Sequence, residues 1–345
     1  MTSKRYLGNI ITDTPTEPTE NYANSAASGV WSLAEAERYT AAGLWPNAAN
    51  LAPRGVFGLG LDNGGAKINV INKIEIGTTG DAVDFGDLSV TRASFASLSS
   101  ATRAVFAGGT TGSQSNVIDY KEFSSTGNAA DFGDISQASN EMAGSGSDTR
   151  GVFSVNYTAS TEYITYASTG NSTSFGDFAA FNYSYRSTAV SSNTRVVFCG
   201  NGDASQDDIM EYFTIASTGN ATDFGDLVTP VGSMCKGQAS SGTRGIIAGG
   251  EPAGSARTNV IQYITIASAG NSTDFGDLSV ASNNGMACSS TTRGVLTIAS
   301  GDGVGVVDTI DYITIASTGN ATDFGDLTQA AYQGAGCSNA HGGLQ

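Results

Sequence analysis

A Phe-Gly-Asp triplet recurs six times along this chain, at intervals of 43 to 51 residues. The triplets begin at Phe85, Phe132, Phe175, Phe224, Phe275 and Phe324. A period of this size is typical of proteins in which one supersecondary unit is copied, so that each copy buries its apolar surface against its neighbours. The repeat therefore constrains the architecture of the chain far more than it constrains a ligand.

Each copy contains short, β-branched apolar runs bounded by Gly, Asn and Ser, and none contains an apolar helical pattern. In the fifth copy these runs are 243–250, 259–266 and 271–278, and a segment of small residues, 285–290, follows them. Four short strands in each of six copies predict an all-β fold, a six-bladed β-propeller with four-stranded blades. The first copy lacks its innermost strand, so we expect 332–340 to complete it and close the ring.

Two kinds of charged residue recur with the triplet. An Arg opens the second strand of every copy, and an Asp ends every triplet. We expect each Arg to bond carboxylate or backbone groups near a triplet and so to hold blade to blade. Calcium binding at the Asp-rich turns stays open as the alternative, although one pair of Asp per blade supplies few ligands. The two sets are Arg54, Arg103, Arg150, Arg195, Arg244, Arg293 and Asp87, Asp134, Asp177, Asp226, Asp277, Asp326.

A hairpin turn of constant length precedes each triplet. It reads Ser-Thr-Gly-Asn in four copies, and Gly followed by Asn or Asp supplies the positive-φ residues that a tight hairpin needs. The Asn-x-Thr pattern within it, as at Asn220, also matches a glycosylation site. The copied turn is the simpler interpretation.

Composition excludes several classes of function. The net charge is −16 and the chain has 16 Lys and Arg, so nucleic acid and anionic membranes are not expected partners. No apolar run is long enough to insert into a membrane, and the first residues lack the apolar core of a signal peptide. The single histidine, His341, leaves little for a catalytic triad or a metal site. We therefore expect no enzyme activity, no cofactor and no bound metal, and we expect the four Cys to be free and buried.

Residues 1–53 do not fit the repeat, so the sequence predicts an N-terminal extension followed by a propeller over 54–345. Thr12–Glu20 is rich in Thr, Pro and Glu and is typical of an extended linker. Ser32 and Glu35 form the pattern of a capping box, and Gly43 with Pro46 forms a helix stop. We expect one short helix with the two Trp of the chain, Trp31 and Trp45, at its ends.

Two resemblances extend this interpretation. The repeat over 54–340 resembles kelch repeats in its Gly pairs (Gly108-Gly109, Gly249-Gly250), its strand aromatics and its recurrent Arg, although the usual Trp is replaced by Phe. Kelch-like propellers serve mainly as binding scaffolds. Residues 28–46, with the pattern Gly-Val-Trp-Ser-Leu through Trp-Pro, resemble a segment of phage tail and tail-fibre proteins.

The second resemblance implies a structural protein of a bacteriophage particle, assembled in the host cytoplasm and present in multiple copies. The extension would attach it to other virion proteins, with Trp31 and Trp45 as buried anchors, and the propeller would contact a host-surface polysaccharide or another virion protein. Two alternatives stay open. One is a decoration protein of the same particle without a ligand, and the other is a carbohydrate-binding lectin unrelated to viruses.

The loops between the second and third strands vary in length and sequence, which favours their face as the recognition surface. Aromatic side chains gather there in the third copy. Exposed rings beside amide and guanidinium groups suit a sugar, although the same rings could pack on each other to cover a wide loop. The candidate ligand-binding residues are Tyr157, Phe181, Tyr183, Tyr185 and Arg186.

Overall fold

The computed structural model describes Ser32, Ala34, Glu35 and residues 52–344, except 156–157, 182–185, 202–207, 253–255 and 302–304. The chain divides into two compact units, Met1–Ala52 and Pro53–Gln345. In the first unit the backbone N–H of Ser32 donates to the Glu35 carboxylate at 2.9 Å, and the N–H of Glu35 donates to Ser32 Oγ at 3.3 Å, which is the reciprocal geometry of a capping box. Trp31, Trp45 and most of the expected helix lie outside the described residues.

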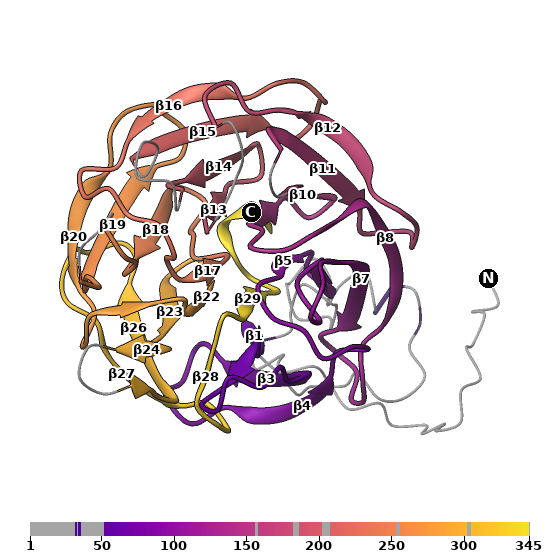
Figure 1. Cartoon of the computed structure of the whole chain (residues 1–345), viewed down its shortest axis with the longest axis horizontal. Coiled ribbons are helices and arrows are strands. Elements are labelled where there is room, and N and C mark those ends of the chain that lie inside the picture. The colour runs from indigo at the N-terminus through magenta and orange to yellow at the C-terminus, as the bar shows by residue number, and fades with distance from the viewer. Residues whose placement is uncertain are drawn as a thin grey trace. The chain divides into compact units, whose positions relative to one another are not determined.

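The second unit consists of antiparallel meanders, one for each repeat, whose strands follow one another side by side from the centre to the rim (Figure 1). We number the repeats one to six in the order of their Phe-Gly-Asp triplets. The innermost strands are β29 (Ala335–Ser338), β5 (Ala96–Ser99), β9 (Gly144–Gly146), β13 (Thr188–Ser191), β17 (Lys236–Gly237) and β22 (Met286–Ser289). The second strands are β1 (Arg54–Gly58), β6 (Arg103–Ala107), β10 (Arg150–Ser154), β14 (Arg195–Cys199), β18 (Arg244–Ala248) and β23 (Arg293–Thr297).

The outer half of each meander is a hairpin. Its third strands are β3 (Val70–Glu75), β7 (Ser115–Glu122), β11 (Ser160–Thr165), β15 (Ile209–Thr214), β19 (Val260–Thr265) and β26 (Thr309–Thr314). Its rim strands, which carry the triplets, are β4 (Val83–Asp87), β8 (Ala130–Ser139), β12 (Thr173–Asp177), β16 (Thr222–Asp226), β20 (Thr273–Asp277) and β27 (Thr322–Asp326). Short strands in the connections are β2 (Leu61–Asp62), β21 (Ser282–Asn283), β24 (Ser300–Gly301), β25 (Gly305–Val306) and β28 (Ala331–Tyr332), and a 3₁₀ turn, η2, spans Gly342–Leu344.

The expectation of a six-bladed propeller with six separate four-stranded blades is wrong. Repeats two, three and four each form a four-stranded sheet, but repeat five keeps three strands, β18-β19-β20. Repeats one and six join through β17 into one curled nine-stranded sheet, β27-β26-β23-β22-β17-β29-β1-β3-β4. In the first unit Ala34 and Glu35 are helical, and no helix in the described part of the chain is long and apolar enough to cross a membrane.

A two-residue insertion explains this departure. Ser241 lies eight positions after Ser233 in repeat five, whereas Ser100 lies six positions after the corresponding Ser94 in repeat two. The extra length lets Lys236 and Gly237 leave their own meander and pair in parallel with β22, and Gly237 also pairs with β29. Gly237 has a φ of 134°, and a Cβ there would lie 2.1 Å from the Ala287 carbonyl oxygen, so only glycine fits.

The expected pairing of the C-terminal strand with the first repeat is confirmed. β29 pairs antiparallel with β1 in the register Gly55↔Ser338 to Gly58↔Ala335. The contact joins β29 to residues about 280 positions earlier in the chain, and it covers the edge that β1 would otherwise expose.

The core lies between neighbouring meanders, where the apolar sides of facing strands meet. Every Phe of a triplet is at most 7% exposed. In repeats two to six, this Phe also packs edge-to-face on the Tyr of its own third strand, with ring centroids 5.6 to 6.1 Å apart. The recurrent aromatic residues therefore serve the core.

Candidate binding site

The recurrent Arg residues hold each repeat to the next through backbone carbonyl groups. Nη1 of each Arg donates, at 2.6 to 2.9 Å, to a carbonyl at the start of the outer hairpin turn in the following repeat. In repeats two to six the guanidinium also lies 4.4 to 5.0 Å from the ring centroid of the neighbouring Tyr. Arg293 closes this series by donating to the Ile76 carbonyl of repeat one.

The predicted bonds that hold each Arg to the neighbouring repeat are confirmed, and the partners across the boundary are backbone carbonyl groups and not the triplet carboxylates. None of the four ion pairs found in the described part of the chain contains a triplet Asp. Instead, the backbone N–H of each such Asp donates to the side chain of Asn in the next hairpin turn, or of Asp81 where the ring closes. The described residues also hold no group of three or more His, Cys, Asp or Glu that is arranged to bind a metal.

The triplet Gly permits this contact. A Cβ on Gly276 would lie 2.5 Å from the Gly319 carbonyl oxygen of the next turn, and the other five triplets show the same close approach. At five of the six contacts the turn Gly in return donates its N–H to the triplet Phe carbonyl, as Gly319 does to Phe275 at 2.8 Å. Phe-Gly-Asp and Ser-Thr-Gly-Asn are therefore two halves of one contact, which explains why their spacing is constant and why the Asn-x-Thr pattern recurs.

A second recurrent contact is not apparent from the triplet pattern. The residue before the third-strand Tyr, or before Lys73 in repeat one, is polar in every repeat. Its side chain accepts hydrogen bonds from the connection that follows the triplet of the preceding repeat. The six acceptors are Asn72, Asp119, Glu162, Glu211, Gln262 and Asp311. All are buried, and the recurrence of a polar residue at this offset is the signal that could have revealed them.

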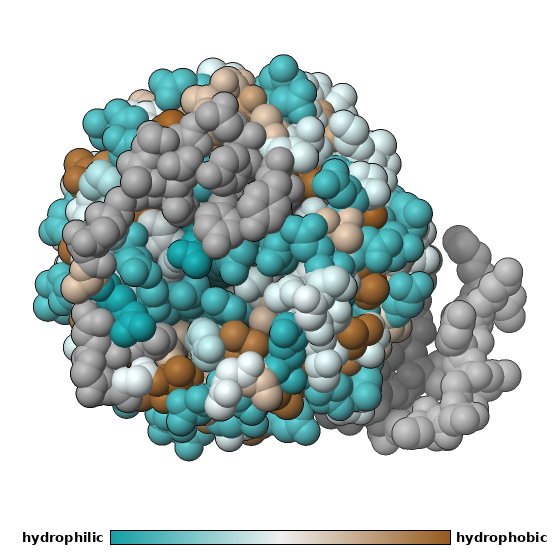
Figure 2. Space-filling model, in the orientation of Figure 1, coloured by the Kyte–Doolittle hydropathy of each residue, from teal (hydrophilic) through white to brown (hydrophobic). Residues whose placement is uncertain are grey.

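A closed ring of backbone hydrogen bonds surrounds the centre of the second unit. In each repeat one non-Gly residue before the innermost strand has a φ between 54° and 58°. Each donates its N–H to the carbonyl of its counterpart in a neighbouring repeat, at 2.7 to 3.3 Å, until the sixth bond returns to the first. The members are Ser94, Glu141, Arg186, Ser233, Asn284 and Gln333. Hydrophilic residues gather around the centre of the face seen in Figure 2.

Polar side chains from different repeats fill the centre. Lys236 Nζ lies 2.7 Å from Glu141 Oε2, and the two side chains are 2% and 9% exposed. Burial alone would raise the pKa of Glu141, but attraction by Lys236 and hydrogen bonds from Lys236 and Ser94 outweigh it, so the pKa lies below its ordinary value. Gln238 accepts a hydrogen bond from Ser99 Oγ at 2.5 Å and donates to Ser145 Oγ at 3.4 Å. Through Lys236 and Gln238, repeat five therefore bonds to side chains of repeats two and three at the centre.

The C-terminal segment reaches the same centre. His341 is fully buried, and because the Gly343 N–H donates to Nδ1, the proton of the neutral ring sits on Nε2 and is donated to the Ser99 carbonyl. Burial lowers the pKa of His341 to about 4, and the bond to Ser99 opposes the shift. His341 is a structural residue in this setting. The four Cys are free and buried, as expected, and burial raises their pKa values.

His341 predicts a stability difference that depends on pH. Its folded pKa of about 4 lies below the ordinary value of 6.5, so between these values the unfolded chain binds a proton that the folded chain excludes. The neutral imidazole therefore stabilises the fold fully above pH 6.5, and this contribution falls by about 3 kcal/mol as pH drops to 4. Urea unfolding of the wild type and His341→Gln at pH 7, 6, 5 and 4 should show the gap between them narrowing with acid. A constant gap would contradict the assignment.

Of the five candidate ligand residues, only Phe181 and Arg186 lie among the described residues. Phe181 is 1% exposed and packs edge-to-face on Phe178, with ring centroids 5.1 Å apart, and its backbone N–H donates to Glu211. The expectation that Phe181 presents an exposed ring is wrong, because it belongs to the core between repeats three and four. Arg186 belongs to the central ring of backbone bonds. Tyr157, Tyr183 and Tyr185 lie outside the described residues.

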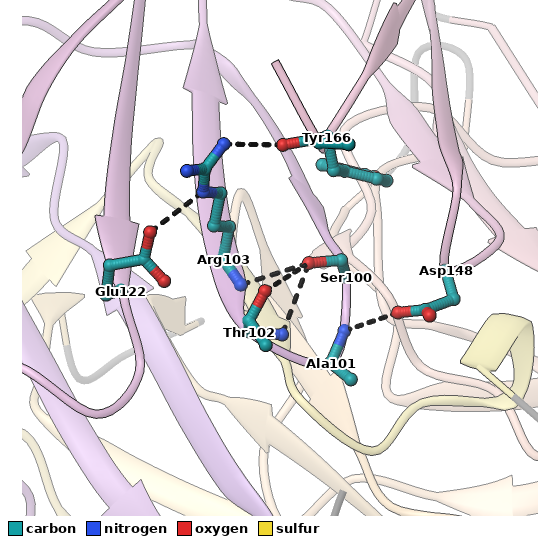
Figure 3. Close-up of a pocket in the computed structure, with 8 residues that line it drawn as sticks. Ser100, Ala101, Thr102, Arg103, Glu122, Asp148 and Tyr166 are labelled. Atoms are coloured by element: carbon teal, nitrogen blue, oxygen red, sulfur yellow. Dashed lines mark hydrogen bonds and ion pairs between the residues drawn. The ribbon is translucent and has the colours of Figure 1, made fainter. Parts of the chain in front are cut away.

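A groove of about 410 Å³ lies between repeats two and three (Figure 3). Repeat two contributes the turn between β5 and β6, the first residue of β6 and the end of β7. Repeat three contributes the turn before β10 and the residues after β11. The lining residues are Ser100, Ala101, Thr102, Arg103, Glu122, Asp148, Tyr166 and Ala167.

Charged and polar groups of the groove are held in place by hydrogen bonds. Arg103 Nε lies 2.8 Å from Glu122 Oε1, and Arg103 Nη1 donates to the Tyr166 carbonyl at 2.6 Å. Asp148 Oδ1 accepts the Ala101 N–H across the boundary between the repeats at 2.8 Å. The arrangement offers fixed carboxylates, a guanidinium and hydroxyls, which bind polar groups but include no activated nucleophile. Comparison with known protein families and with curated proteins finds no match to the chain.

Proposed function

We propose that this chain is a non-enzymatic structural protein of a bacteriophage particle, a tail or fibre component that presents a rigid scaffold to a host-surface glycan or to another virion protein. One observation carries the scaffold part of the proposal. The residues that recur in every repeat, which are the Arg, the triplets and the buried acceptors, are engaged in contacts between repeats. Their chemistry serves assembly, so no repeated catalytic site is needed to explain them.

The virion part of the proposal rests on the N-terminal sequence. Residues 28–46 carry the Trp-containing pattern that resembles phage tail and tail-fibre proteins. In this proposal residues 1–53 attach the chain to other virion proteins, with Trp31 and Trp45 as anchors, because large aromatic residues commonly carry binding energy at such contacts. The kelch-like repeat would then hold the contact surface away from the attachment point.

Electron microscopy tests the location. Bacteriophage particles produced by the organism that encodes this chain are labelled with a gold-conjugated antibody raised against residues 53–345. We expect gold on the tail or its fibres. A chain lacking residues 1–50 should lose this label while keeping the circular dichroism spectrum of the strands. Full labelling without residues 1–50 would contradict the role of the extension, and unlabelled particles would contradict the virion assignment and favour a lectin.

A further inference from the structure

The groove between repeats two and three differs from its five counterparts in the ring. Opposite the recurrent Arg in the paired second and third strands, repeat two has Glu122, whereas repeats three to six have Thr. In the Ser-x-Thr-Arg turn, repeat three has Asp148 at the variable position. The corresponding residues in the other repeats are Ala101, Asn193, Gly242, Thr291 and Ala340.

The five other boundaries between repeats show which contacts are needed to join one repeat to the next. Glu75 of repeat one also pairs with its Arg, at 3.1 Å, but it faces a repeat whose turn residue is Ala101. Among the six boundaries, the boundary of repeats two and three alone has two carboxylates, Glu122 and Asp148, in the groove that the recurrent Arg lines. The other boundaries keep the Arg-to-carbonyl bond without this combination. The pair Glu122 and Asp148 is consequently not needed to join the repeats.

The groove offers both acceptors and donors toward solvent. Glu122 is 35% exposed and Arg103 is 22% exposed, so each keeps polar atoms accessible after the bonds between them are made. Asp148 and Thr102 are exposed, whereas Ser100 is buried and its hydroxyl is held by the backbone N–H groups of Thr102 and Arg103. Each hydroxyl of a sugar both donates and accepts, so it can bond a carboxylate and a guanidinium at once. The volume lies within the range of small-molecule sites, roughly 300–1,000 Å³.

We propose that this groove binds a neutral polyhydroxylated ligand, one sugar unit of a glycan, with Glu122 and Asp148 accepting its hydroxyls and Arg103 donating to them. The inference deepens the glycan-contact part of the proposed function and rests on it. It also moves the contact away from the variable loops, to a face formed by turns of constant length. The groove is built on strands and fixed turns, so little ordering is required when a ligand binds.

The full chain is tested by saturation-transfer NMR with D-glucose, D-galactose, L-rhamnose and N-acetyl-D-glucosamine. We expect at least one sugar to bind, and we expect the double variant Glu122→Thr/Asp148→Asn to weaken it at least tenfold. Thr and Asn occupy the corresponding positions of other repeats, so the variant should keep its melting temperature. The matched control Glu75→Thr removes the same ion pair from repeat one and should leave binding unchanged.

Several outcomes would overturn the inference. They are binding of none of the four sugars, equal binding by the double variant, or an equal loss in Glu75→Thr. Calcium chloride or 1,4-diaminobutane is added alone in parallel. Thermal stabilisation by either one that disappears in the double variant, with no sugar bound, would make the groove a cation site instead. Sugar binding in a chain that does not label particles would leave the groove intact and contradict only the virion assignment. Labelled particles without sugar binding would contradict only the groove.

Discussion

Deletion of residues 331–345 should abolish cooperative folding of the second unit. The deletion removes β29 from its pairing with β1, opens the centre occupied by His341, and breaks the ring of backbone bonds at Gln333. We expect a loss of more than about 5 kcal/mol, which is comparable to the whole stability of many domains. Circular dichroism melting and size-exclusion chromatography of the truncated protein should show a broad transition and an expanded chain.

A peptide comprising residues 331–345 provides the control for this deletion. Added in excess to the truncated chain, it should restore a cooperative melt, because a strand that binds only the folded state stabilises that state by mass action. A truncated chain that melts like the intact protein without the peptide would show that β29 does not close the ring.

Replacing Lys236 should have a large effect on stability for a single side chain. Lys236→Met leaves the Glu141 carboxylate buried at the centre without its ion-pair partner, and breaking a buried pair in this way costs about 3–5 kcal/mol. Glu141 should then take up a proton more readily, so the variant should lose less stability at pH 5 than at pH 7 relative to the wild type. Urea unfolding at the two pH values measures both effects.

Two further variants serve as controls. The first removes both buried charges, and the second breaks a partly exposed ion pair. Lys236→Met/Glu141→Gln removes both charges and should recover most of the lost stability, since no uncompensated charge remains. Glu122→Thr breaks a partly exposed ion pair, 22% and 35% exposed, and should cost no more than about 1 kcal/mol. A double variant as unstable as Lys236→Met would show that the lysine acts through its packing and not through its charge.

The sequence by itself determined the contacts that repeat. Six triplets, the constant hairpin turn and the recurrent Arg predicted an all-β chain of copied meanders, bonds between neighbouring repeats, and a C-terminal strand that pairs with the first repeat. These features could be predicted because each depends on local residues at a fixed spacing. Six copies of the same local contact make that spacing easy to recognise. Burial of the four Cys could be predicted for a related reason, since the other repeats have small or apolar residues at the corresponding positions.

The tertiary structure decided everything that departs from the repeat. Two extra residues in repeat five send Lys236 to Glu141, 95 positions away, and join two repeats into the nine-stranded sheet in place of separate blades. A spacing count detects such an insertion but cannot say whether it forms a loop or enters the centre. Phe181 looked like a ligand contact because its neighbours are polar and aromatic, yet its ring faces the core. Glu122 and Asp148 belong to different repeats, and only the folded ring places them around one groove, because it brings the end of one third strand beside the turn of the next repeat.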